Sequence, residues 1–396
     1  MKIGRPPPAA LTWGWRDIVS SARWAFSDRK IALHARGVAI SYLLALAYLY
    51  LLPAGDSVAP LRQRFSDTRF DLAALLGSTV AAAFESGNGR GGPAAAVYLA
   101  PVLFAALWAV NAYYGIAVAR MTCMQVRGDF FAELRDGLAC ARRRLGGVLA
   151  VMLVLAAFPM LVAAAMLAGG ALTRIPAVGG AWLAVGPVLM LPAFFLSLLV
   201  ALVTLILIAG AMALPAIAGV SDDRAVETSY QLTVIVWGQG WRLMAYHVLT
   251  LVVAAVSGLA FVAIGARAFF WTVSAVCAGA PRYPEIVSAA AHALWGDSRG
   301  VAWLTGWQFA PAAGLGTAEQ VSVWVTGAAF FGVTVVFLAY VVSVVSVGSA
   351  MGYMNLLRRI WGVNVLVASQ DETQTDADAA PSSARPAPTT TSGDGQ

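Results

Sequence analysis

Histidine, cysteine and glycine residues are the first places to look for chemistry in this chain. The three histidines stand alone in the sequence, and no cysteine belongs to a C-x-x-C pair or has a histidine at metal-ligand spacing. The glycine cluster at residues 87–92 lacks the Lys-Ser/Thr ending of a phosphate-binding loop and is better explained as a flexible turn. The sequence therefore predicts no catalysis, no metal and no organic cofactor.

Two polar residues fall inside long apolar segments. Asn111 is the strongest candidate for an intramembrane polar role, and His247 is expected to hydrogen-bond between helices rather than to act as a ligand or base. No Asp, Glu, Lys or Arg lies within the six apolar windows given below. Proton- and ion-coupled transporters usually keep such residues at mid-membrane, so this pattern disfavours them.

Arg142, Arg143 and Arg144 form the clearest basic cluster. They end a stretch beginning at Asp129 that has an apolar stripe at helical spacing, with its charges off that stripe. Arginines beside an anionic leaflet attract lipid headgroups, so these three are candidates for docking lipid or a protein partner. The alternative is that they act only during insertion, as topology signals.

The composition places these residues in a membrane protein. Hydrophobic residues make up 60% of the chain and charged residues 12%, with a mean hydropathy of +0.74. The core of a soluble domain cannot bury so much apolar surface. The net charge of +6 is modest and comes almost entirely from arginines beside the apolar segments, so no nucleic-acid partner is expected.

Six windows are long enough to cross about 30 Å of hydrocarbon as helices. Because backbone groups in lipid must pair within their own segment, we expect an all-α polytopic protein with amphipathic interfacial helices. In the fourth window Pro187 and Pro192 are expected to break the helix and leave an interfacial piece. The windows are Gly37–Pro53, Ala94–Ala119, Leu145–Gly169, Pro187–Pro215, Leu243–Gly265 and Val321–Gly352.

Basic residues set the expected orientation. About two thirds of the 26 Lys and Arg residues fall on one side if the chain crosses six times, which predicts both termini in the cytoplasm. The expected organisation is a cytoplasmic segment with an amphipathic helix at 1–36, a membrane domain at 37–354, and a cytoplasmic segment with a disordered acidic tail at 355–396. A bacterial inner membrane is the default location for such a helical bundle.

Two long outer loops are expected to hold interfacial structure. The loop Ala54–Pro93 contains a predicted interfacial helix at Phe70–Glu85. The loop Ala266–Gln320 contains four tryptophans, which favour the headgroup level. They are Trp271, Trp295, Trp303 and Trp307.

An internal repeat is suggested by three similar stretches on the inner side. Each stretch begins with an Asp, at Asp17, Asp129 and Asp223, and precedes the first, third or fifth span. Asp is a good N-cap because its carboxylate accepts from free N–H groups of the first helical turn. We therefore predict three two-helix units, each made of a surface helix, an outward crossing and a returning one. The alternative is that any polytopic protein with short inner loops looks similar.

A segment of about thirty residues resembles a known family. Leu214-Pro215-Ala216-Ile217, Ser229-Tyr230-Gln231-Leu232 and Trp241-Arg242 are similar to the membrane domain of bacterial glycerophosphodiester phosphodiesterases and to YciC-like polytopic proteins. Thr228 departs from the Arg that often precedes this Ser. The soluble catalytic domain of those phosphodiesterases has no counterpart here, so the resemblance implies architecture and no active site.

These observations favour a non-enzymatic membrane protein that organises lipids or a protein partner at its cytoplasmic face. The alternative is a permease or export subunit for a neutral or lipid-like substrate, which a water-accessible path past Asn111 would favour. An enzyme acting on lipid ranks last because it rests on the resemblance alone. The sequence does not set the oligomeric state.

Overall fold

The structure is a computed structural model in which every described element is an α-helix. It describes residues 11–51, 94–129, 133–172, 176–221, 225–280, 282–295, 305–307 and 314–362. The helices are α1 (Trp15–Val19), α2 (Ser21–Ala25), α3 (Asp28–Leu51), α6 (Ala94–Val126), α7 (Leu134–Leu172), α8 (Pro176–Val220), α9 (Ala225–Cys277), α10 (Tyr283–Trp295) and α12 (Thr317–Trp361).

Six of these helices are long and apolar enough to cross a membrane, so the chain is an all-α multi-pass membrane protein as the composition predicts. The spans are Asp28–Tyr48 in α3, Val102–Val126 in α6, Leu134–Val162 in α7, Phe194–Val220 in α8, Glu227–Cys277 in α9 and Thr317–Trp361 in α12. Each overlaps one predicted window.

Several helices extend beyond the predicted windows. The helix α3 begins at Asp28 rather than near Gly37, and α7 begins at Leu134 and runs through the three arginines without a break. The predicted surface helix and the third span are therefore one element. Arginine is a good helix former, and nothing between Leu134 and the apolar run stops the helix.

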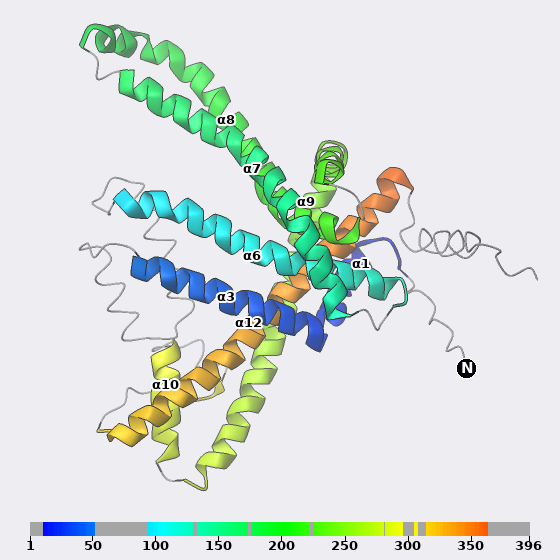
Figure 1. Cartoon of the computed structure of the whole chain (residues 1–396), viewed down its shortest axis with the longest axis vertical. Coiled ribbons are helices and arrows are strands. Elements are labelled where there is room, and N and C mark those ends of the chain that lie inside the picture. Colours follow the sequence, from blue (N-terminus) through cyan, green and yellow to red (C-terminus); the bar gives the residue numbers. More distant parts are fainter. Residues whose placement is uncertain are drawn as a thin grey trace, which may run out of the picture.

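The expected break at Pro187 and Pro192 is wrong. The helix α8 continues from Pro176 to Val220, although its first turns run in a different direction from the rest (Figure 1). A proline removes one donor and bends a helix, but in membrane helices neighbouring groups can satisfy the freed carbonyls. The prolines therefore do not end this helix.

The helix α9 is interrupted near its start. Gln239 has non-helical backbone angles, φ −141° and ψ 25°, between Gly238 and Gly240. Glycines on both sides lower the cost of a kink. The kink separates a short first segment, residues 225–238, from the long part that includes the predicted fifth span.

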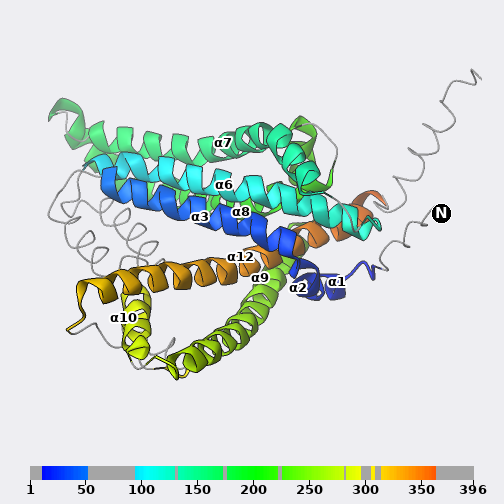
Figure 2. The same cartoon turned by 60° about the horizontal axis from the view of Figure 1, so that its bottom comes forward.

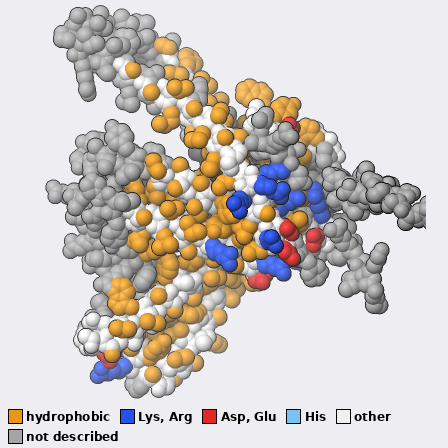
Figure 3. Space-filling model, in the orientation of Figure 1, with side chains coloured by type: hydrophobic (Ala, Val, Ile, Leu, Met, Phe, Trp, Pro, Cys, Tyr) orange, Lys and Arg blue, Asp and Glu red, His pale blue; other side chains and the backbone are white. Residues whose placement is uncertain are grey.

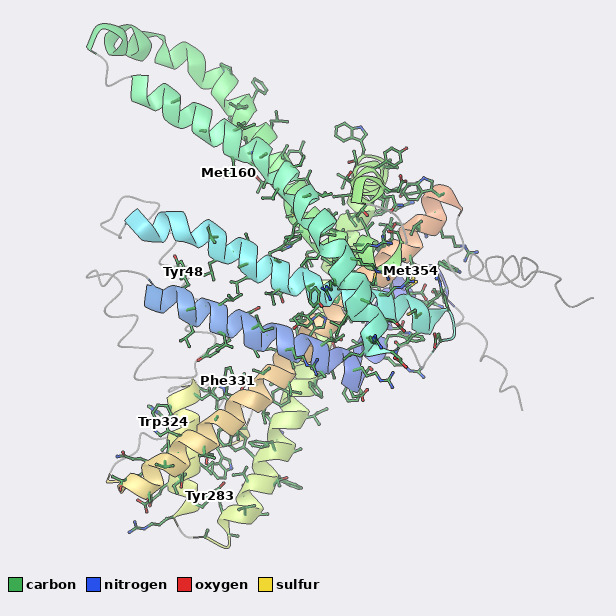
Figure 4. The ribbon with its side chains drawn as sticks, in the orientation of Figure 1. Tyr48, Met160, Tyr283, Trp324, Phe331 and Met354 are labelled. Atoms are coloured by element: carbon green, nitrogen blue, oxygen red, sulfur yellow. The ribbon has the colours of Figure 1, made fainter. Side chains whose placement is uncertain are left out.

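All consecutive spans contact one another, and in Figure 1 they diverge as three pairs, α3 with α6, α7 with α8, and α9 with α12. The pairs meet at one end of the molecule and diverge towards the other (Figures 1 and 2). We call the meeting end, where α1, α2 and the C-terminal part of α12 lie, the basic end, and the opposite end the loop end. Met354 marks the convergence and Met160 the diverging part of α7 (Figure 4). The sequence repeat itself stays a prediction.

Helices approach closely near the basic end because small residues lie at their contacts. A Cβ added to Gly219 in α8 would lie 2.6 Å from the Ala119 Cβ and 2.6 Å from the Ile116 carbonyl oxygen in α6. Likewise a Cβ on Gly348 in α12 would lie 2.5 Å from the Thr250 Cγ2 in α9. The small residues of α12 therefore serve helix packing, the more frequent role of such a face.

At the loop end α10 lies between α9 and α12 and closes an aromatic cluster (Figure 2). Trp295 stacks on Phe330 with ring centroids 5.6 Å apart, and Trp307 lies 5.5 Å from Phe270. These two tryptophans are partly buried against the aromatic cluster, whereas Trp271 is 85% exposed and suits the predicted headgroup level. Trp303 lies outside the described residues.

An ion pair joins the beginnings of α10 and α12. Arg282 donates from Nη1 to Glu319 Oε1 at 2.7 Å. This hydrogen bond and the neighbouring charge raise the pKa of Arg282 above its usual value. The pair is exposed, so it contributes little to stability.

Three further predictions fall on residues that the structure does not describe. They are the interfacial helix Phe70–Glu85, the capping role of Asp223, and the disorder of the tail after Ser369.

Candidate functional site

Basic side chains gather at the basic end, while apolar side chains cover the diverging helices (Figure 3). Arginines of α7 and α6 lie at this end, together with those of α3 and of the last turns of α12. The six long helices supply the apolar surface that fixes this end at a membrane boundary. A surface of this kind attracts anions.

Two of the three candidate docking arginines line a pocket. It lies between the end of α6 and the beginning of α7 and has a volume of about 290 Å³. Its lining consists of Arg120, Met124, Asp136, Ala139, Cys140, Arg143 and Arg144. Arg142 is exposed and is not among the lining residues, so the predicted cluster divides.

Helical spacing explains why these side chains meet. On α7, Asp136, Cys140 and Arg143 or Arg144 follow one another at intervals of three or four residues, which places them on one face. Arg120 and Met124 are likewise four apart on α6. Arg143 is partly held by its own helix, since its Nε donates to the Ala139 carbonyl oxygen at 3.4 Å.

The sequence reading missed Arg120 as a partner of this cluster. Nothing local in the sequence links Arg120 to the arginines of the following helix, because the two lie on different helices separated by a turn. The available signal is the spacing of Arg120 and Met124, which lie four residues apart at the end of an apolar run. This spacing places both side chains on one face of α6, and that face lies opposite the face of α7 that contains Asp136.

Asn111 lies on the outside of α6. Its Nδ2 donates to the Leu107 carbonyl oxygen at 2.7 Å, within its own helix, and lies 3.5 Å from Ser41 Oγ on α3. The residue is exposed. In this position its amide is satisfied at the surface of the bundle.

His247 is buried on α9, close to the backbone of Ala209 in α8 and of Leu243 in its own helix. Its Nε2 has no hydrogen-bond partner among the described residues. The hydrogen bond between helices that the sequence predicts for His247 stays a prediction. Asn111 and His247 are not brought together with the arginine pocket, whose lining comes from other parts of α6 and from α7.

The residues 11–26, which we call the N-terminal strap, lie across α9 and α12 at the basic end. Asn355 Nδ2 donates to the Gly14 carbonyl oxygen at 3.0 Å, and the Arg358 guanidinium lies 4.4 Å from the Trp13 ring centroid. The prediction that Asp17 is the N-cap of α1 is wrong. The N-cap of this helix is Gly14. The Asp17 carboxylate instead accepts from the Gly14 N–H at 3.2 Å.

A buried lysine was missed by the sequence reading because it precedes the first predicted window. Lys30 is fully buried near the start of α3, and its Nζ donates to the Trp24 carbonyl oxygen of the strap at 2.9 Å. His34, one turn further along α3, is also buried, and its Nε2 has no partner in the described part of the chain. The available signal in the sequence is the spacing of four residues between Lys30 and His34, which places both side chains on one face of the helix.

Exposed aromatic residues flank the kink of α9. Trp237 is 87% exposed and Trp241 70% exposed, and the Arg242 guanidinium lies 4.9 Å from the Trp241 ring centroid. Large exposed tryptophans beside arginines are typical of the membrane–water interface. The beginning of α9 therefore suits the headgroup level.

Electrostatic binding is the chemistry that this end of the molecule supports. The guanidinium groups are permanent cations with fixed donor geometry, suited to carboxylates and phosphates. Among the described residues, no group of three or more His, Cys, Asp or Glu side chains could hold a metal ion.

In comparisons with known proteins, no family model, no curated protein and no solved structure matches this chain. The resemblance to the membrane domain of glycerophosphodiester phosphodiesterases stays a prediction.

Proposed function

We propose that this chain is a non-enzymatic multi-pass membrane protein that binds anionic lipid, and through it or beside it a protein partner, at its basic end. That end faces the cytoplasm, the membrane is a bacterial inner membrane, and both termini are cytoplasmic. The gathering of arginines at one end of a six-span bundle carries the proposal (Figure 3). The positive-inside rule gives the orientation.

The expected energetics follow from the charge. Each basic residue close to an anionic leaflet contributes about 1 kcal/mol to the attraction. Neutralising Arg142, Arg143 and Arg144 would therefore cost about 3 kcal/mol, on the order of a hundredfold in affinity. The exposed Trp237 and Trp241 support this surface by fixing the depth of the α9 kink at the headgroup level.

The test replaces all three arginines by Gln in the full chain. Wild type and variant are reconstituted in nanodiscs of mixed neutral and anionic phospholipid, and the anionic lipid that stays bound after mild detergent extraction is measured by mass spectrometry. We expect the variant to retain far less anionic lipid while its circular dichroism is unchanged. The control is Arg267→Gln with Arg282→Gln, which removes two of the basic residues outside the basic end.

Retention of anionic lipid at the wild-type level by the triple variant would contradict the proposal. In that case the cluster acts only as a topology signal, and the variant should insert into cells in the inverted orientation. Proteins that co-purify with wild type and disappear with the triple variant would identify the partner.

A second candidate is a permease for a neutral or lipid-like substrate. Lys30 and His34 favour it, because buried ionisable residues in a membrane helix are often functional. It ranks second because Lys30 is the third residue of α3, and His34 lies only about 6 Å deeper at 1.5 Å per residue. Both residues are thus near the membrane boundary rather than at mid-membrane.

A further inference from the structure

The pocket between α6 and α7 has features of a site for one chemical group. We infer that Arg120, Arg143 and Arg144 bind a phosphomonoester, supplied by the headgroup of a phosphatidic acid type of lipid. This inference rests on the proposed function, lipid binding at the basic end, and deepens it by naming the ligand class. The pocket lies on two membrane-spanning helices at the end where the arginines gather.

Charge selects the ligand. The pocket's lining contains three guanidinium groups and one carboxylate, so cationic groups predominate in it. A phosphomonoester has a charge of about −1.5 to −2 near neutral pH, whereas the phosphodiester of an ordinary headgroup has one negative charge. The monoester is therefore attracted more strongly than the diester to a lining in which guanidinium groups predominate. Its three terminal oxygens also accept from several arginines at once, which a phosphodiester with two such oxygens does less well.

Size restricts the ligand to a headgroup. A volume of about 290 Å³ is at the lower limit for small-molecule pockets, which hold roughly 300–1,000 Å³. A phosphate and the adjoining carbons fit such a space, but acyl chains do not. Met124, Ala139 and Cys140 supply the less polar part of the lining, where the first carbons of the lipid would lie.

The outer surface of α7 gives the acyl chains a place. Leu153 is 70% exposed and Val154 is 74% exposed. They follow Arg144 by nine and ten residues, about 14 Å along the helix at 1.5 Å per residue. A lipid whose phosphate occupies the pocket can therefore extend its chains along this apolar surface. A free phosphate ester has the same headgroup chemistry but lacks this second contact.

The experiment compares two lipids with identical acyl chains, phosphatidic acid and phosphatidylglycerol, titrated onto the full-length protein in detergent and followed by native mass spectrometry. Wild type is expected to bind phosphatidic acid about five- to tenfold more tightly, the effect of roughly one additional charge. The variant Arg120→Gln/Arg143→Gln should lose this preference. The matched variant Arg23→Gln/Arg359→Gln removes the same charge from exposed positions of the basic end outside the pocket and should keep the preference. Thermal unfolding in detergent checks that both variants are folded.

The outcomes separate the site from the general proposal. Equal binding of the two lipids by wild type, or equal loss in both variants, overturns the phosphomonoester site and leaves anionic lipid binding intact. Failure of wild type to bind either lipid overturns both. Inorganic phosphate is added as a competitor. Displacement of the lipid only at far higher phosphate concentration supports the lipid source, and displacement at equal concentration assigns the pocket to a soluble phosphate ester instead.

Discussion

Basic residues of the same type have different roles at the basic end according to their surroundings. Arg143 and Arg144 line the pocket, their neighbour Arg142 faces outward, and Lys30 is enclosed by protein. An arginine at the surface contributes through long-range attraction, whereas a buried lysine must be held by specific partners because removing its charge from water is costly. Burial therefore separates Lys30 from the arginines, whereas position around the helix separates Arg142 from Arg143, since both of these are exposed.

Lys30 gives a prediction at this scale. The chain has only two lysines, Lys2 and Lys30, so amine labelling can be assigned to single peptides. We expect an amine-reactive ester to modify Lys30 very slowly in the folded protein and rapidly after denaturation, because Lys30 is fully buried and its Nζ is held by Trp24. Mass spectrometry of the peptide containing Lys30 measures both rates.

Labelling of Lys30 at the same rate in folded and denatured protein would show that water reaches it. That result would favour the permease, because a permease needs a water-accessible path and this one would pass beside Lys30 and His34.

The contacts between helices depend on residues that are small rather than apolar. Gly219 allows α8 to approach the backbone of α6, and Gly348 allows α12 to approach α9. Both contacts lie in the half of the bundle where buried residues concentrate, which includes Ile217 and Val347. In lipid, helices associate mainly through such close packing, because the apolar environment itself gives no driving force.

Gly219→Ala should therefore destabilise the protein. Its new Cβ would lie 2.6 Å from a backbone oxygen of α6, which cannot move aside as a flexible side chain would. Overpacking of this kind costs about 1–3 kcal/mol. Thermal unfolding in mild detergent should show a clear decrease in Tm.

The matched control is Gly146→Ala on α7, where a Cβ would meet nothing within 4 Å. Alanine is the better helix former, so this variant should be as stable as wild type or more so. Equal Tm values for the two variants would show that α6 and α8 are not in close contact at Gly219.

The three stretches of the predicted repeat take three different forms in the whole molecule. The first is the strap with α1 and α2, the second is continuous with α7, and the third is separated from the rest of α9 by the kink at Gln239. All three nevertheless lie at the end where the three helix pairs converge (Figure 1). The two ends of the described chain also lie there, as an even number of crossings requires.

The proposed orientation predicts which positions react from outside. In a background with the three native cysteines replaced by Ala, Gly279→Cys lies at the loop end and Glu133→Cys at the basic end, and both positions are exposed. In intact spheroplasts an impermeant thiol reagent should label Gly279→Cys and spare Glu133→Cys. Permeabilised cells, in which both should react, are the control, and the reverse labelling pattern would overturn the orientation.

The sequence by itself determined the helical class, the number of spans and their approximate positions. It also placed Arg142, Arg143 and Arg144 beside the beginning of the third span. These features are local: a run of about twenty apolar residues must be helical in lipid whatever its neighbours are. For the same reason the predicted breaks at Pro187 and Pro192 failed, since a local rule for soluble helices does not hold where the surroundings cannot hydrogen-bond to an open backbone.

Only the tertiary structure decided which side chains share a site. Arg120 joins Arg143 and Arg144, while Arg142 is left outside, because α6 and α7 meet in one rotational setting. The burial of Lys30 likewise depends on a strap that is held to α12 by Asn355. Helix rotation and close approach are set by interlocking shapes such as Gly219 against Ile116, and residues far apart in sequence supply the two halves of each contact.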